Sequence, residues 1–519
     1  MTKWLSLVLC AMMLLGALPT LAAAEGELAP LEISVAVWDI ENAKLDAAEP
    51  DAILKMVQEK FNVTFVPMNV GWGDYTDKYT TWAAGGSLPD ISGGIDWAAG
   101  SGTYYQWIED GVVRALPKDL SKYPNVEKYV NLPEVQSLAV DGENYIFPRM
   151  TYSDSSYWCM DRGLMIRKDW LENLGLEMPT KKEDLLPIMQ AFTENDPDGN
   201  GKKDTIGFGY EQVFPTSQHF ACFGDTDSRW MKNEEGVWVK PQFEATTIPL
   251  MDMLRTAYKN GWMDQDFAAR NPKDVQEMFA SGQIGILGKQ NTPKHVKQIY
   301  DTWVVNQPDI AFEDAVALVP FDDPDSVAFS EKSFWSETYV AGNVDDEKLE
   351  RILMIMDYLY SDEGFMLMTY GIEGTDYTVD AEGNVTITRP MNAEGNNFVA
   401  LSDVYPSTGC FGQLAQWNGD LSQYIEPTIP EVIREMCIVE RDRRIATWKP
   451  MNVDWEVWDL NVPEKFELSA DVKAWSKVIA DTSDATTEEL YQQLLTEWNA
   501  QGYEACKKAI TEAAAAIGK

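Results

Sequence analysis

The sequence predicts an α/β protein with more than one domain. Residues 31–37 alternate between apolar and polar side chains, as a half-buried strand does, and residues 62–70 form a second such run. Residues 50–61 and 74–84 have the apolar spacing of helices. The chain has 519 residues, which is enough for two or more domains with buried cores. This order of strands and helices predicts a parallel sheet.

Several polar and aromatic residues come just after the predicted strands. The third strand is expected to end near Asp90 and Ile91, with the glycines that follow in a loop. Ligands of parallel sheets collect at the carboxyl ends of the strands. Three tryptophan–carboxylate pairs fall at these ends: Trp38 with Asp39, Trp72 with Asp74, and Asp96 with Trp97. We therefore expect a ligand site at this edge.

Charge is the unusual feature of the composition. The chain has 42 Lys and Arg against 83 Asp and Glu, a formal net charge of −41. Such a surface repels nucleic acid and anionic membranes, so no nucleic-acid partner is expected. Only His219 and His295 are present, which nearly excludes histidine-based catalysis and a multi-histidine metal site. The 19 Trp and 21 Tyr residues are many, and core packing accounts for most of them.

Residues 1–24 are interpreted as a signal peptide. Lys3 gives a short basic start, residues 4–18 form an apolar run, and Ala22 to Ala24 supply a cleavage site. Cys10 lies in the middle of the apolar run, so we interpret it as part of the signal and not as a lipid-anchoring residue. The mature protein is thus expected outside the cytoplasmic membrane, either in a periplasm or at the cell exterior.

The remaining cysteines form no recognisable framework. They are scattered and odd in number: Cys159, Cys222, Cys410, Cys437 and Cys506. This spacing fits neither a disulfide scaffold nor a metal knuckle, although one or two bridges are compatible with it.

The segment from Asp196 to Asp204 has the pattern of a calcium loop. Oxygen-bearing residues occupy positions 1, 3, 5 and 9 of an EF-hand-type loop, position 6 is Gly201, and position 7 offers a backbone carbonyl. The predicted ligands are Asp196, Asp198, Asn200, the carbonyl of Lys202, and Asp204. Position 12 is Gly207 and not the usual glutamate, so the site is truncated or completed from elsewhere. A turn without metal is the alternative. We favour a structural Ca²⁺ ion between a helix at 181–192 and a strand at 206–208.

The order of segments along the chain suggests a family. The segments are 88–91, 163–180, 196–205, 279–288, 315–320 and 371–377, which read LPDI, GLMIRKDWLENLGLEMPT, DPDGNGKKDT, FASGQIGILG, AVALVP and GIEGTDY. In this order they resemble the family 1 extracellular solute-binding proteins of bacterial ABC importers. The resemblance is to the large carbohydrate-binding members, which include alginate- and fructo-oligosaccharide-binding proteins, and it covers residues 30–515.

The resemblance implies a class II periplasmic-binding-protein fold, in which two α/β lobes joined by hinge crossings enclose a ligand cleft. The N-terminal lobe would hold residues 30–147 and about 320–345, and the C-terminal lobe 150–317 and about 346–519. Relatives place calcium in the C-terminal lobe through residues equivalent to those of the 196–204 loop. The alginate-binding relatives have a further ligand, a glutamate, where this chain has Thr205.

Sugar sites combine aromatic faces with carboxylate, amide and guanidinium groups. Each candidate has a plainer explanation in core packing or a salt bridge. The expected ligand-binding residues are Trp38, Asp39, Trp72, Asp74, Asp96, Trp97, Arg149, Trp158, Trp335, Glu337 and Trp417. The positive cluster from Arg434 to Arg444 could meet an anionic ligand, but pairing with nearby acids is favoured.

The implied function is the solute-binding component of an ABC importer. It would capture an oligosaccharide by closing the cleft and deliver it to membrane permease subunits, as a monomer and without catalysis. Two alternatives stay open. Paired acids could make the protein a secreted glycosidase or lyase, although no nucleophile elbow, H-E-x-x-H, P-loop or C-x-x-C motif is present. It could also be a peptide- or sugar-binding module unconnected with transport.

Overall fold

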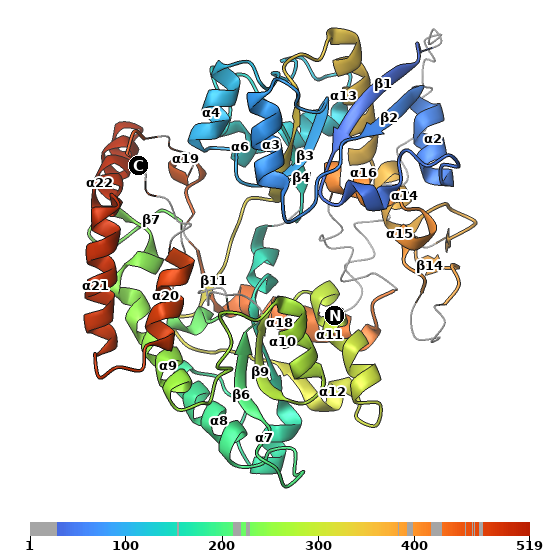
Figure 1. The fold of residues 1–519 in the computed structure, drawn as a ribbon. Helices are drawn as coiled ribbons and strands as arrows, with labels where there is room; N and C mark the ends of the chain where they lie inside the picture. The colour runs from blue at the N-terminus through green and yellow to red at the C-terminus, as the bar shows by residue number, and fades with distance from the viewer. Residues whose placement is uncertain are drawn as a thin grey trace.

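The protein folds into two lobes, each built around its own sheet and core (Figure 1). The computed structural model describes residues 28–152, 155–210, 219–224, 229–381, 383–391, 398–416, 428–451, 453–458, 460, 462–464, 466 and 471–519, without the side chains of 471–474. The predicted signal peptide therefore lies outside the described residues.

The first lobe contains a five-stranded sheet in the order β2-β1-β3-β12-β4. Its strands are β1 (Leu31–Ala36), β2 (Val63–Pro67), β3 (Ile91–Ile95), β4 (Ile146–Met150) and β12 (Phe334–Val340). Strand β1 pairs in parallel with β2 and β3, which confirms the parallel unit expected from the sequence. Strand β12 runs antiparallel to both β3 and β4.

Strand β3 extends further than expected. Gly93 and Gly94 belong to the strand and not to a loop. A Cβ atom on Gly93 would lie 2.8 Å from Leu414 Cδ2 and 2.9 Å from Val37 Cγ1, so only glycine lets the helix that ends at Leu414, α16 (Thr408–Leu414), pack this closely on the sheet. The glycines thus mark a packing contact inside the strand.

The helices of the first lobe come from two distant parts of the chain. They are η1 (Ile40–Ala43), α2 (Ala52–Phe61), α3 (Tyr75–Ala84), α4 (Gly102–Glu109), α5 (Pro124–Val130), α6 (Pro133–Gln136), α13 (Asp346–Tyr360), α14 (Asp362–Tyr370), α15 (Leu401–Val404) and α16 (Thr408–Leu414). A small hairpin, β13 (Tyr377–Val379) with β14 (Val385–Ile387), follows α14.

The structure differs from the expected lobe boundary after residue 346. Buried residues of α13, α14 and α16, such as Ile352 and Phe411, belong to the same core as β1 to β4. The apolar faces of these helices cover the first sheet, so the stretch up to residue 416 lies with the first lobe and not with the second.

The second lobe contains a four-stranded sheet in the order β10-β5-β9-β6. Its strands are β5 (Gly163–Arg167), β6 (Ile206–Tyr210), β9 (Ile284–Lys289) and β10 (Val316–Leu318). The helices around it are η2 (Ser155–Met160), α7 (Lys168–Leu174), α8 (Lys182–Glu194), η3 (Ala221–Phe223), η4 (Pro241–Phe243), η5 (Ala245–Thr247), α9 (Ile248–Lys259), α10 (Pro272–Ala280), α11 (Pro293–Asn306), α12 (Phe312–Ala315) and α18 (Glu431–Thr447). Short strand pairs complete the lobe: β7 (Met231–Lys232) with β8 (Trp238–Val239), and β11 (Val327–Ala328) with β15 (Lys449–Pro450).

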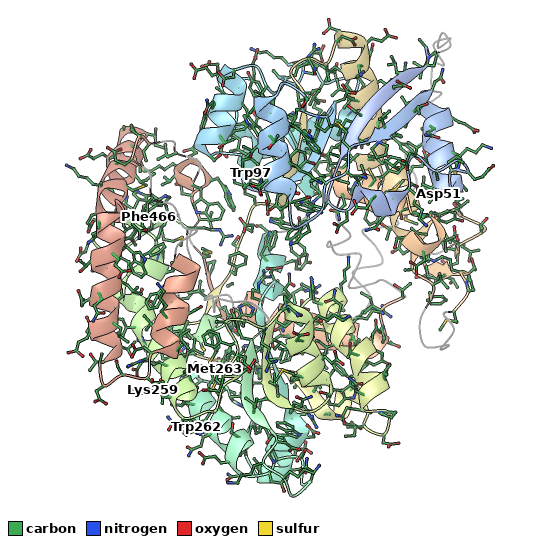
Figure 2. All side chains as sticks on the ribbon, viewed as in Figure 1. Asp51, Trp97, Lys259, Trp262, Met263 and Phe466 are labelled. Carbon is green, nitrogen blue, oxygen red and sulfur yellow. The ribbon has the colours of Figure 1, made fainter. Side chains whose placement is uncertain are left out.

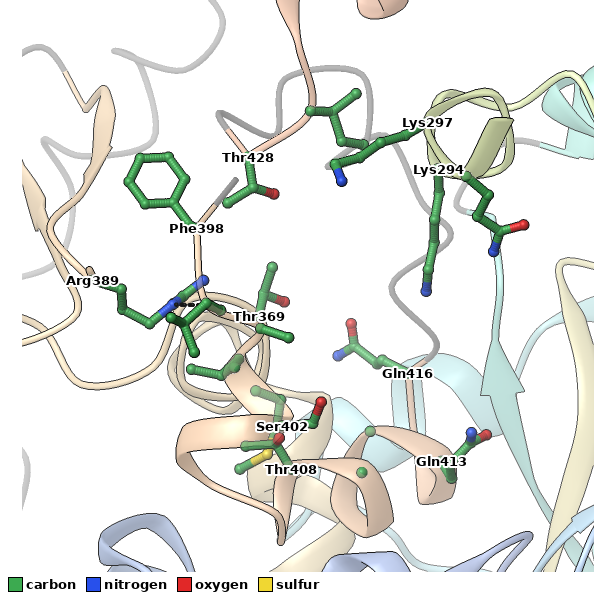
Figure 3. A pocket seen from close by; sticks show the side chains of 18 of the residues that line it. Lys294, Lys297, Thr369, Arg389, Phe398, Ser402, Thr408, Gln413, Gln416 and Thr428 are labelled. Carbon is green, nitrogen blue, oxygen red and sulfur yellow. Dashed lines mark hydrogen bonds between the residues drawn. The ribbon is translucent and has the colours of Figure 1, made fainter. Parts of the chain in front are cut away.

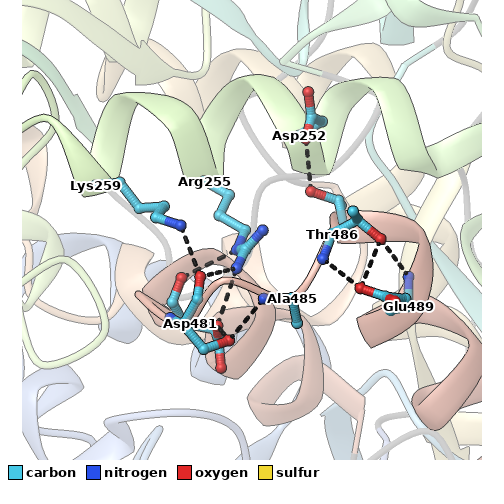
Figure 4. A network of polar contacts seen from close by, with 9 residues as sticks. Asp252, Arg255, Lys259, Asp481, Ala485, Thr486 and Glu489 are labelled. Atoms are coloured by element: carbon cyan, nitrogen blue, oxygen red, sulfur yellow. Dashed lines mark hydrogen bonds and ion pairs between the residues drawn. The ribbon is translucent and has the colours of Figure 1, made fainter.

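The C-terminal helices are α19 (Trp455–Trp458), α20 (Asp471–Ala480), α21 (Thr487–Ala500) and α22 (Tyr503–Ala516), with a break at Gly502 (φ 106°). Helices α20 and α21 pack against α9 of the second lobe, and α22 packs against α21 and β8. Figure 4 shows the polar contacts between α9 and the segment that joins α20 to α21. Arg255 Nη2 donates to Asp481 Oδ1 at 3.0 Å, and Thr487 Oγ1 donates to Asp252 Oδ1 at 2.6 Å. Thr486 and Glu489 form a capping box that starts α21.

The chain crosses between the lobes after β4, before β12, and between α16 and α18. Among the described residues, no helix is both long and apolar enough to cross a membrane.

Candidate functional site

The carboxyl ends of the first-lobe strands bring the predicted site residues together. Trp38 follows β1, Trp72 follows β2, and Asp96 follows β3. Because β12 is antiparallel to β3, its first residues, including Trp335, lie at the same edge. Arg149 reaches this edge from the end of β4, whose Met150 is paired with Phe334.

Four aromatic rings form one group at this edge, which we call the edge aromatic group: Trp38, Trp72, Tyr75 and Trp335. The ring centroid of Trp38 lies 4.7 Å from Trp72 and 5.2 Å from Trp335. Tyr75 stacks on Trp72 with centroids 5.6 Å apart. Trp38 is 7% exposed but Trp72 is 52% exposed, so the group has a buried base and an open face. An open indole face suits the apolar side of a ring-shaped ligand.

Two of the predicted carboxylates position Trp72. Asp39 Oδ1 accepts a hydrogen bond from the Trp72 backbone N–H at 3.1 Å. Asp74 Oδ1 accepts one from the Gly71 N–H at 2.8 Å. Asp74 also pairs with Lys78 at 2.9 Å, which together with the Gly71 bond lowers the pKa of Asp74. The two side chains therefore fix the turn that presents the exposed indole.

Arg149 lies beneath the aromatic group and is fully buried. Its guanidinium carbon is 5.0 Å from the ring of Trp38 and 4.9 Å from the ring of Trp335, within cation–π range. Nε donates to the Trp335 carbonyl at 3.1 Å, and Nη1 donates to Gln413 Oε1. Burial lowers the pKa of Arg149 to about 9, against the opposing charges of Asp96 and Glu337. The guanidinium is thus still a cation at neutral pH.

Two carboxylates, the half-buried Asp96 and the buried Glu337, balance this cation. Asp96 Oδ1 accepts a hydrogen bond from the Tyr75 hydroxyl at 2.7 Å. Burial raises the pKa of Asp96, while the Tyr75 bond and the charge of Arg149 oppose the rise. Glu337 is 6% exposed and lies 3.5 Å from the Tyr339 hydroxyl. The charges of this site are therefore set into the edge of the sheet, below the exposed indole.

The remaining predicted residues lie differently. Trp97, labelled in Figure 2, is half-buried and packs edge-on against Trp107, with ring centroids 5.5 Å apart. Trp158 is buried, and its indole N–H donates to the Lys332 carbonyl at 2.9 Å, so the structure gives it a packing role between the lobes. Trp417 lies outside the described residues.

The aromatic contacts continue toward the second lobe. Trp335 packs against a separate cluster that contains Tyr152, Trp158 and Phe329. Arg229 extends it, with its guanidinium 4.7 Å from the rings of both Phe329 and Trp458. A ligand on the edge aromatic group would therefore lie beside the crossings that join the lobes.

Sequence reasoning missed two residues of this site. Tyr75 follows Asp74 directly, so its place in the Trp72 turn was a local signal that could have identified it. Gln413 gave no such signal, because it is separated from Arg149 by 264 residues and reaches it only when α16 packs on the sheet.

The 196–204 loop has several features of a cation site. Gly201, with φ 78°, donates its N–H to Asp196 Oδ2 at 2.9 Å. The other oxygen of Asp196 is buried and has no partner among the described residues. Burial and the charges of Asp204 and Asp196 raise the pKa of Asp198, although the Asn200 N–H opposes this. These oxygens suit a hard cation.

The amide of Asn200 takes part in the same loop. Its Nδ2 donates to Asp198 Oδ2 at 2.7 Å and to Asp204 Oδ1 at 3.1 Å, so a donor group lies between two predicted ligands. Within the described ranges, no group of three His, Cys, Asp or Glu side chains is arranged to hold a metal ion.

Other titratable groups serve the fold. The five mature cysteines are free and buried, so no disulfide forms among them. Arg443 and Arg444 both bind Glu440, at 2.7 Å and 2.6 Å, and Arg441 binds Asp442. The positive cluster in α18 is therefore paired with nearby acids, as the sequence favoured.

Comparison with known proteins identifies relatives. No protein-family model matches the chain. Lipoprotein LipO of Bacillus subtilis is 27% identical over 390 residues, 72% of this chain and 73% of that protein. The polygalacturonan/rhamnogalacturonan-binding protein YtcQ of the same species is 26% identical over 63% of this chain and 62% of its own length. The fructooligosaccharide ABC transporter substrate-binding protein FusA of Streptococcus pneumoniae is 33% identical over 31% of this chain and 32% of its own length.

Solved structures share the fold. FusA in complex with kestose superposes with a TM-score of 0.67 at 17% identity, over 93% of this chain and 98% of the other. The alginate-binding protein AlgQ2, solved without calcium ion, gives 0.68 at 16% identity, over 93% and 97%. The chain is similar in sequence and in fold to ABC-transporter substrate-binding proteins. The resemblance and the two-lobed fold expected from the sequence are thereby confirmed.

These relatives also bear on the calcium loop. One is the calcium-free AlgQ2 structure, and another is an EF-hand mutant of FusA with a TM-score of 0.68 at 18% identity. The names of these two structures thus refer to a calcium ion and to an EF-hand. YtcQ and FusA are named as binding proteins, FusA is named as part of an ABC transporter, and LipO is named as a lipoprotein.

Proposed function

We propose that this protein is the extracytoplasmic solute-binding component of an ABC importer and that it captures an oligosaccharide. The observation that carries the proposal is the half-exposed Trp72 indole, stacked on Tyr75 and set in a group of four rings over a buried arginine. The sugar-binding relatives support it, since YtcQ, FusA and AlgQ2 all carry a saccharide in their names.

The ligand would lie with the apolar face of a sugar ring on Trp72 and Tyr75. Trp97 would extend the contact, because it follows the end of the neighbouring strand β3. Asp39 and Asp74 would act indirectly by fixing the Trp72 turn. Movement of the second lobe toward this surface would enclose the sugar and remove water from the polar contacts.

The partners and location follow from this role. The loaded protein would dock on membrane permease subunits and release the sugar to them, acting as a monomer in a periplasm or at the cell surface. It would not change its ligand chemically. Binding and release by lobe movement need no reacting group. The charged groups of Arg149, Asp96 and Glu337 would instead hold the rings of Trp38 and Trp335 in place.

Titration with glycans tests this proposal. A panel of neutral and acidic oligosaccharides is added while tryptophan fluorescence is followed, and each positive is measured by calorimetry. We expect one glycan class to bind with micromolar or tighter affinity and with a change in fluorescence. The glycan should be recovered intact after long incubation. Release of new reducing ends would overturn the proposal in favour of a glycosidase or lyase.

We further propose that the 196–204 loop binds a structural Ca²⁺ ion. Asp196, Asp198, Asn200, Asp204 and the Lys202 carbonyl would hold it, and the buried free oxygen of Asp196 would become a ligand. The Asn200 amide would have to turn so that its oxygen, and not its nitrogen, faces the ion. In the structure the carboxylates of this loop accept hydrogen bonds from the amide N–H groups of Gly201 and Asn200. Calcium would supply a full positive charge to the same carboxylates.

Thermal unfolding with calcium or EGTA tests the metal site. Calcium at a hundredfold excess over its dissociation constant should stabilise the folded protein by about 2.7 kcal/mol. Asp196→Asn should abolish this shift. Asp380→Asn is a matched control, because Asp380 caps a surface turn by accepting from the Asn384 N–H at 2.8 Å. Equal melting temperatures in calcium and EGTA would contradict the metal site while leaving the glycan proposal intact.

A further inference from the structure

Ser336 has a backbone conformation that is unusual for its position. It lies inside strand β12, is 2% exposed, and has a φ angle of 72°. Residues other than glycine seldom adopt positive φ angles, whereas a strand residue has a φ angle of roughly −120° to −140°. The Ser336 hydroxyl is buried and has no hydrogen-bond partner among the described residues. The side chain therefore does nothing to compensate for this conformation.

The conformation belongs to a β-bulge in β12. Phe334 pairs with Met150 of β4, and Glu337 pairs with Pro148, so three steps along β12 face two steps along β4. One extra residue therefore lies in β12 between Phe334 and Glu337, and Ser336 is in this stretch. Bulges of this kind re-aim side chains and are frequent beside functional sites.

A second bulge, on the other side of β12, contains glycine. The pairing of β12 with β3 is also shifted by one residue, and here the extra residue is in β3 between Ser92 and Ile95. Gly94, in this stretch, has a φ angle of 71°, and a Cβ atom on it would lie 3.0 Å from Cδ2 of the Trp38 indole. Ser336 has nearly the same φ angle without the freedom of glycine, so its bulge is strained.

The bulge changes the direction of the preceding residue, Trp335. In a regular strand alternate side chains share a face, so Trp335 would lie on the face of Tyr339, whose ring contacts Trp107 at 5.8 Å. The extra residue takes Trp335 out of this alternation. Its ring centroid instead lies 5.2 Å from Trp38 and 5.9 Å from Trp72. The bulge therefore brings a third indole to the edge aromatic group.

Two buried side chains hold the backbone of Trp335. Its N–H donates to Thr151 Oγ1 at 3.0 Å, and its carbonyl accepts from Arg149 Nε at 3.1 Å. Thr151 is 1% exposed and Arg149 is fully buried. A strained conformation persists when the surrounding contacts over-determine it, and these two hydrogen bonds fix the peptide groups next to Ser336.

Arg149 extends this series of contacts. Its Nη1 donates to Gln413 Oε1, and Gln413 lies at the wall of a pocket with a volume of about 600 Å³ (Figure 3). The same guanidinium lies 4.9 Å from the Trp335 ring. A shift of the Trp335 carbonyl would therefore displace the cation on which two indoles of the edge aromatic group rest.

We propose that Ser336 is a positioning residue for the edge aromatic group. Its left-handed conformation, and not its hydroxyl, turns the Trp335 indole onto Trp38 and holds the Trp335 carbonyl on Arg149. The link to glycan binding rests on the proposed function, but the orientation of Trp335 is testable without any ligand. A residue that tolerates a positive φ angle should preserve the group, and a β-branched residue should disturb it.

Fluorine NMR of the full-length mature protein, labelled with 5-fluorotryptophan, tests this orientation. The resonance that is lost in Trp335→Phe identifies Trp335. Ser336→Gly and Ser336→Ala should leave this resonance in place, and Ser336→Val should shift it. Ser336→Gly should also not lower the melting temperature, because glycine adopts this φ angle without strain. Deletion of Ser336 makes the steps along β12 and β4 equal, and it should shift the resonance too if Ser336→Val does not fold.

Asp141→Val is the matched control. Asp141 also has a positive φ angle, 53°, but it lies on an exposed turn before β4 and outside the edge aromatic group. The substitution should lower the melting temperature for the same backbone reason as Ser336→Val, while the Trp335 resonance stays in place. A shift of that resonance in both variants would overturn the proposal, since it would report general loosening of the lobe.

Calorimetry with kestose and with trigalacturonate measures the consequence for binding. For a glycan that the wild-type protein binds, Ser336→Val should weaken binding roughly tenfold or more, and Ser336→Gly should stay within about twofold of the wild type. An equal loss in Ser336→Ala would overturn the proposal, because it would assign the effect to the hydroxyl. So would an unchanged Trp335 resonance in Ser336→Val. If the wild-type protein binds neither glycan, the proposed function fails for these sugars, and the Trp335 resonance still decides the role of Ser336.

Discussion

Two aromatic groups in this protein use the same residue types in opposite ways. The edge aromatic group joins four rings at the end of the first sheet, and its Trp72 is 52% exposed. The second group, which we call the C-terminal aromatic group, consists of Phe243, Trp475, Tyr491, Trp498 and Tyr503. Its rings pack at similar distances, with centroids of Phe243 and Trp498 4.8 Å apart, but none of its members is more than 3% exposed.

Their polar surroundings differ as well. In the C-terminal aromatic group the hydroxyls are used internally: Tyr491 donates to the Phe243 carbonyl at 3.1 Å, and Tyr503 donates to Glu244 at 2.7 Å. In the edge aromatic group the buried guanidinium of Arg149 packs against the indoles of Trp38 and Trp335. The carboxylates of Asp39 and Asp74 fix the turn that contains Trp72. Ring clusters therefore become candidate sites when polar groups hold one ring out toward solvent.

The largest expected effect is on the C-terminal aromatic group. Trp498→Ala removes a ring that is 1% exposed and contacts Phe243, Trp475 and Tyr491. The cavity should lower the free energy of unfolding by about 3–5 kcal/mol. Chemical denaturation measures this loss. Glycan affinity of the folded fraction should stay unchanged, and a selective loss of affinity would contradict the assignment of this group to the core.

A smaller and different effect is expected for Trp72→Ala. The indole is half-exposed, so the free energy of unfolding should change by no more than about 0.5 kcal/mol. Oligosaccharide affinity should fall about tenfold or more, because the stacking face is lost. Calorimetry and denaturation on the same variant separate the two quantities.

Trp262→Ala is the matched control for this prediction. Its indole is also partly exposed and donates to Glu194 at 2.9 Å, but it lies on the second lobe, far from the edge aromatic group (Figure 2). It should leave glycan affinity unchanged. Comparable losses of glycan affinity in Trp72→Ala and Trp262→Ala would contradict the assignment of glycan binding to the edge aromatic group.

A pH effect on stability is expected at the edge aromatic group. Burial raises the pKa of Asp96 above its usual 3.8, so the folded protein keeps a proton that the unfolded chain has already released. Stability should therefore fall as the pH rises through this range, by at most about 1.4 kcal/mol per pH unit. Asp96→Asn should remove the contribution of this carboxylate to the slope, as seen by denaturation at increasing pH from the usual pKa of 3.8 upward.

Tyr75→Phe sharpens the same test. The Tyr75 hydroxyl lowers the pKa of Asp96 by donating to it, so losing the hydroxyl should move the pH-dependent fall to higher pH. Asp484→Asn, at an exposed loop position, serves as the control and should leave the wild-type slope. An unchanged slope in Asp96→Asn would mean that this carboxylate is not the group responsible.

The smallest effect concerns fluorescence quenching. Acrylamide reaches exposed indoles only, so Trp72→Phe should reduce the quenched fraction slightly, while Trp498→Phe should not. Equal reductions would show that the two aromatic groups do not differ in exposure.

Local pattern was sufficient for most of the elements. The expected helices at 50–61, 74–84 and 181–192 correspond to α2, α3 and α8, and Gly175 and Gly502 end or separate helices at positive φ angles. These features depend on apolar spacing and on positive φ angles, which neighbouring residues determine. The predicted strand β3 was too short, because Gly93 and Gly94 were interpreted as a loop. The close packing of α16 on Gly93 is the reason why the strand contains glycine.

The sequence by itself determined the α/β class, the family resemblance, and the strand ends at which Trp38, Trp72 and Asp96 lie. Tertiary structure decided which of these residues act together. In the folded protein Tyr75 stacks on Trp72, and Arg149 lies against the indoles of Trp38 and Trp335 and donates to Gln413. Helices α13 to α16 belong to the first lobe, and Trp158 is buried in the packing between the lobes. The physical reason is that exposure and charge balance depend on contacts between residues hundreds of positions apart, which no local pattern records.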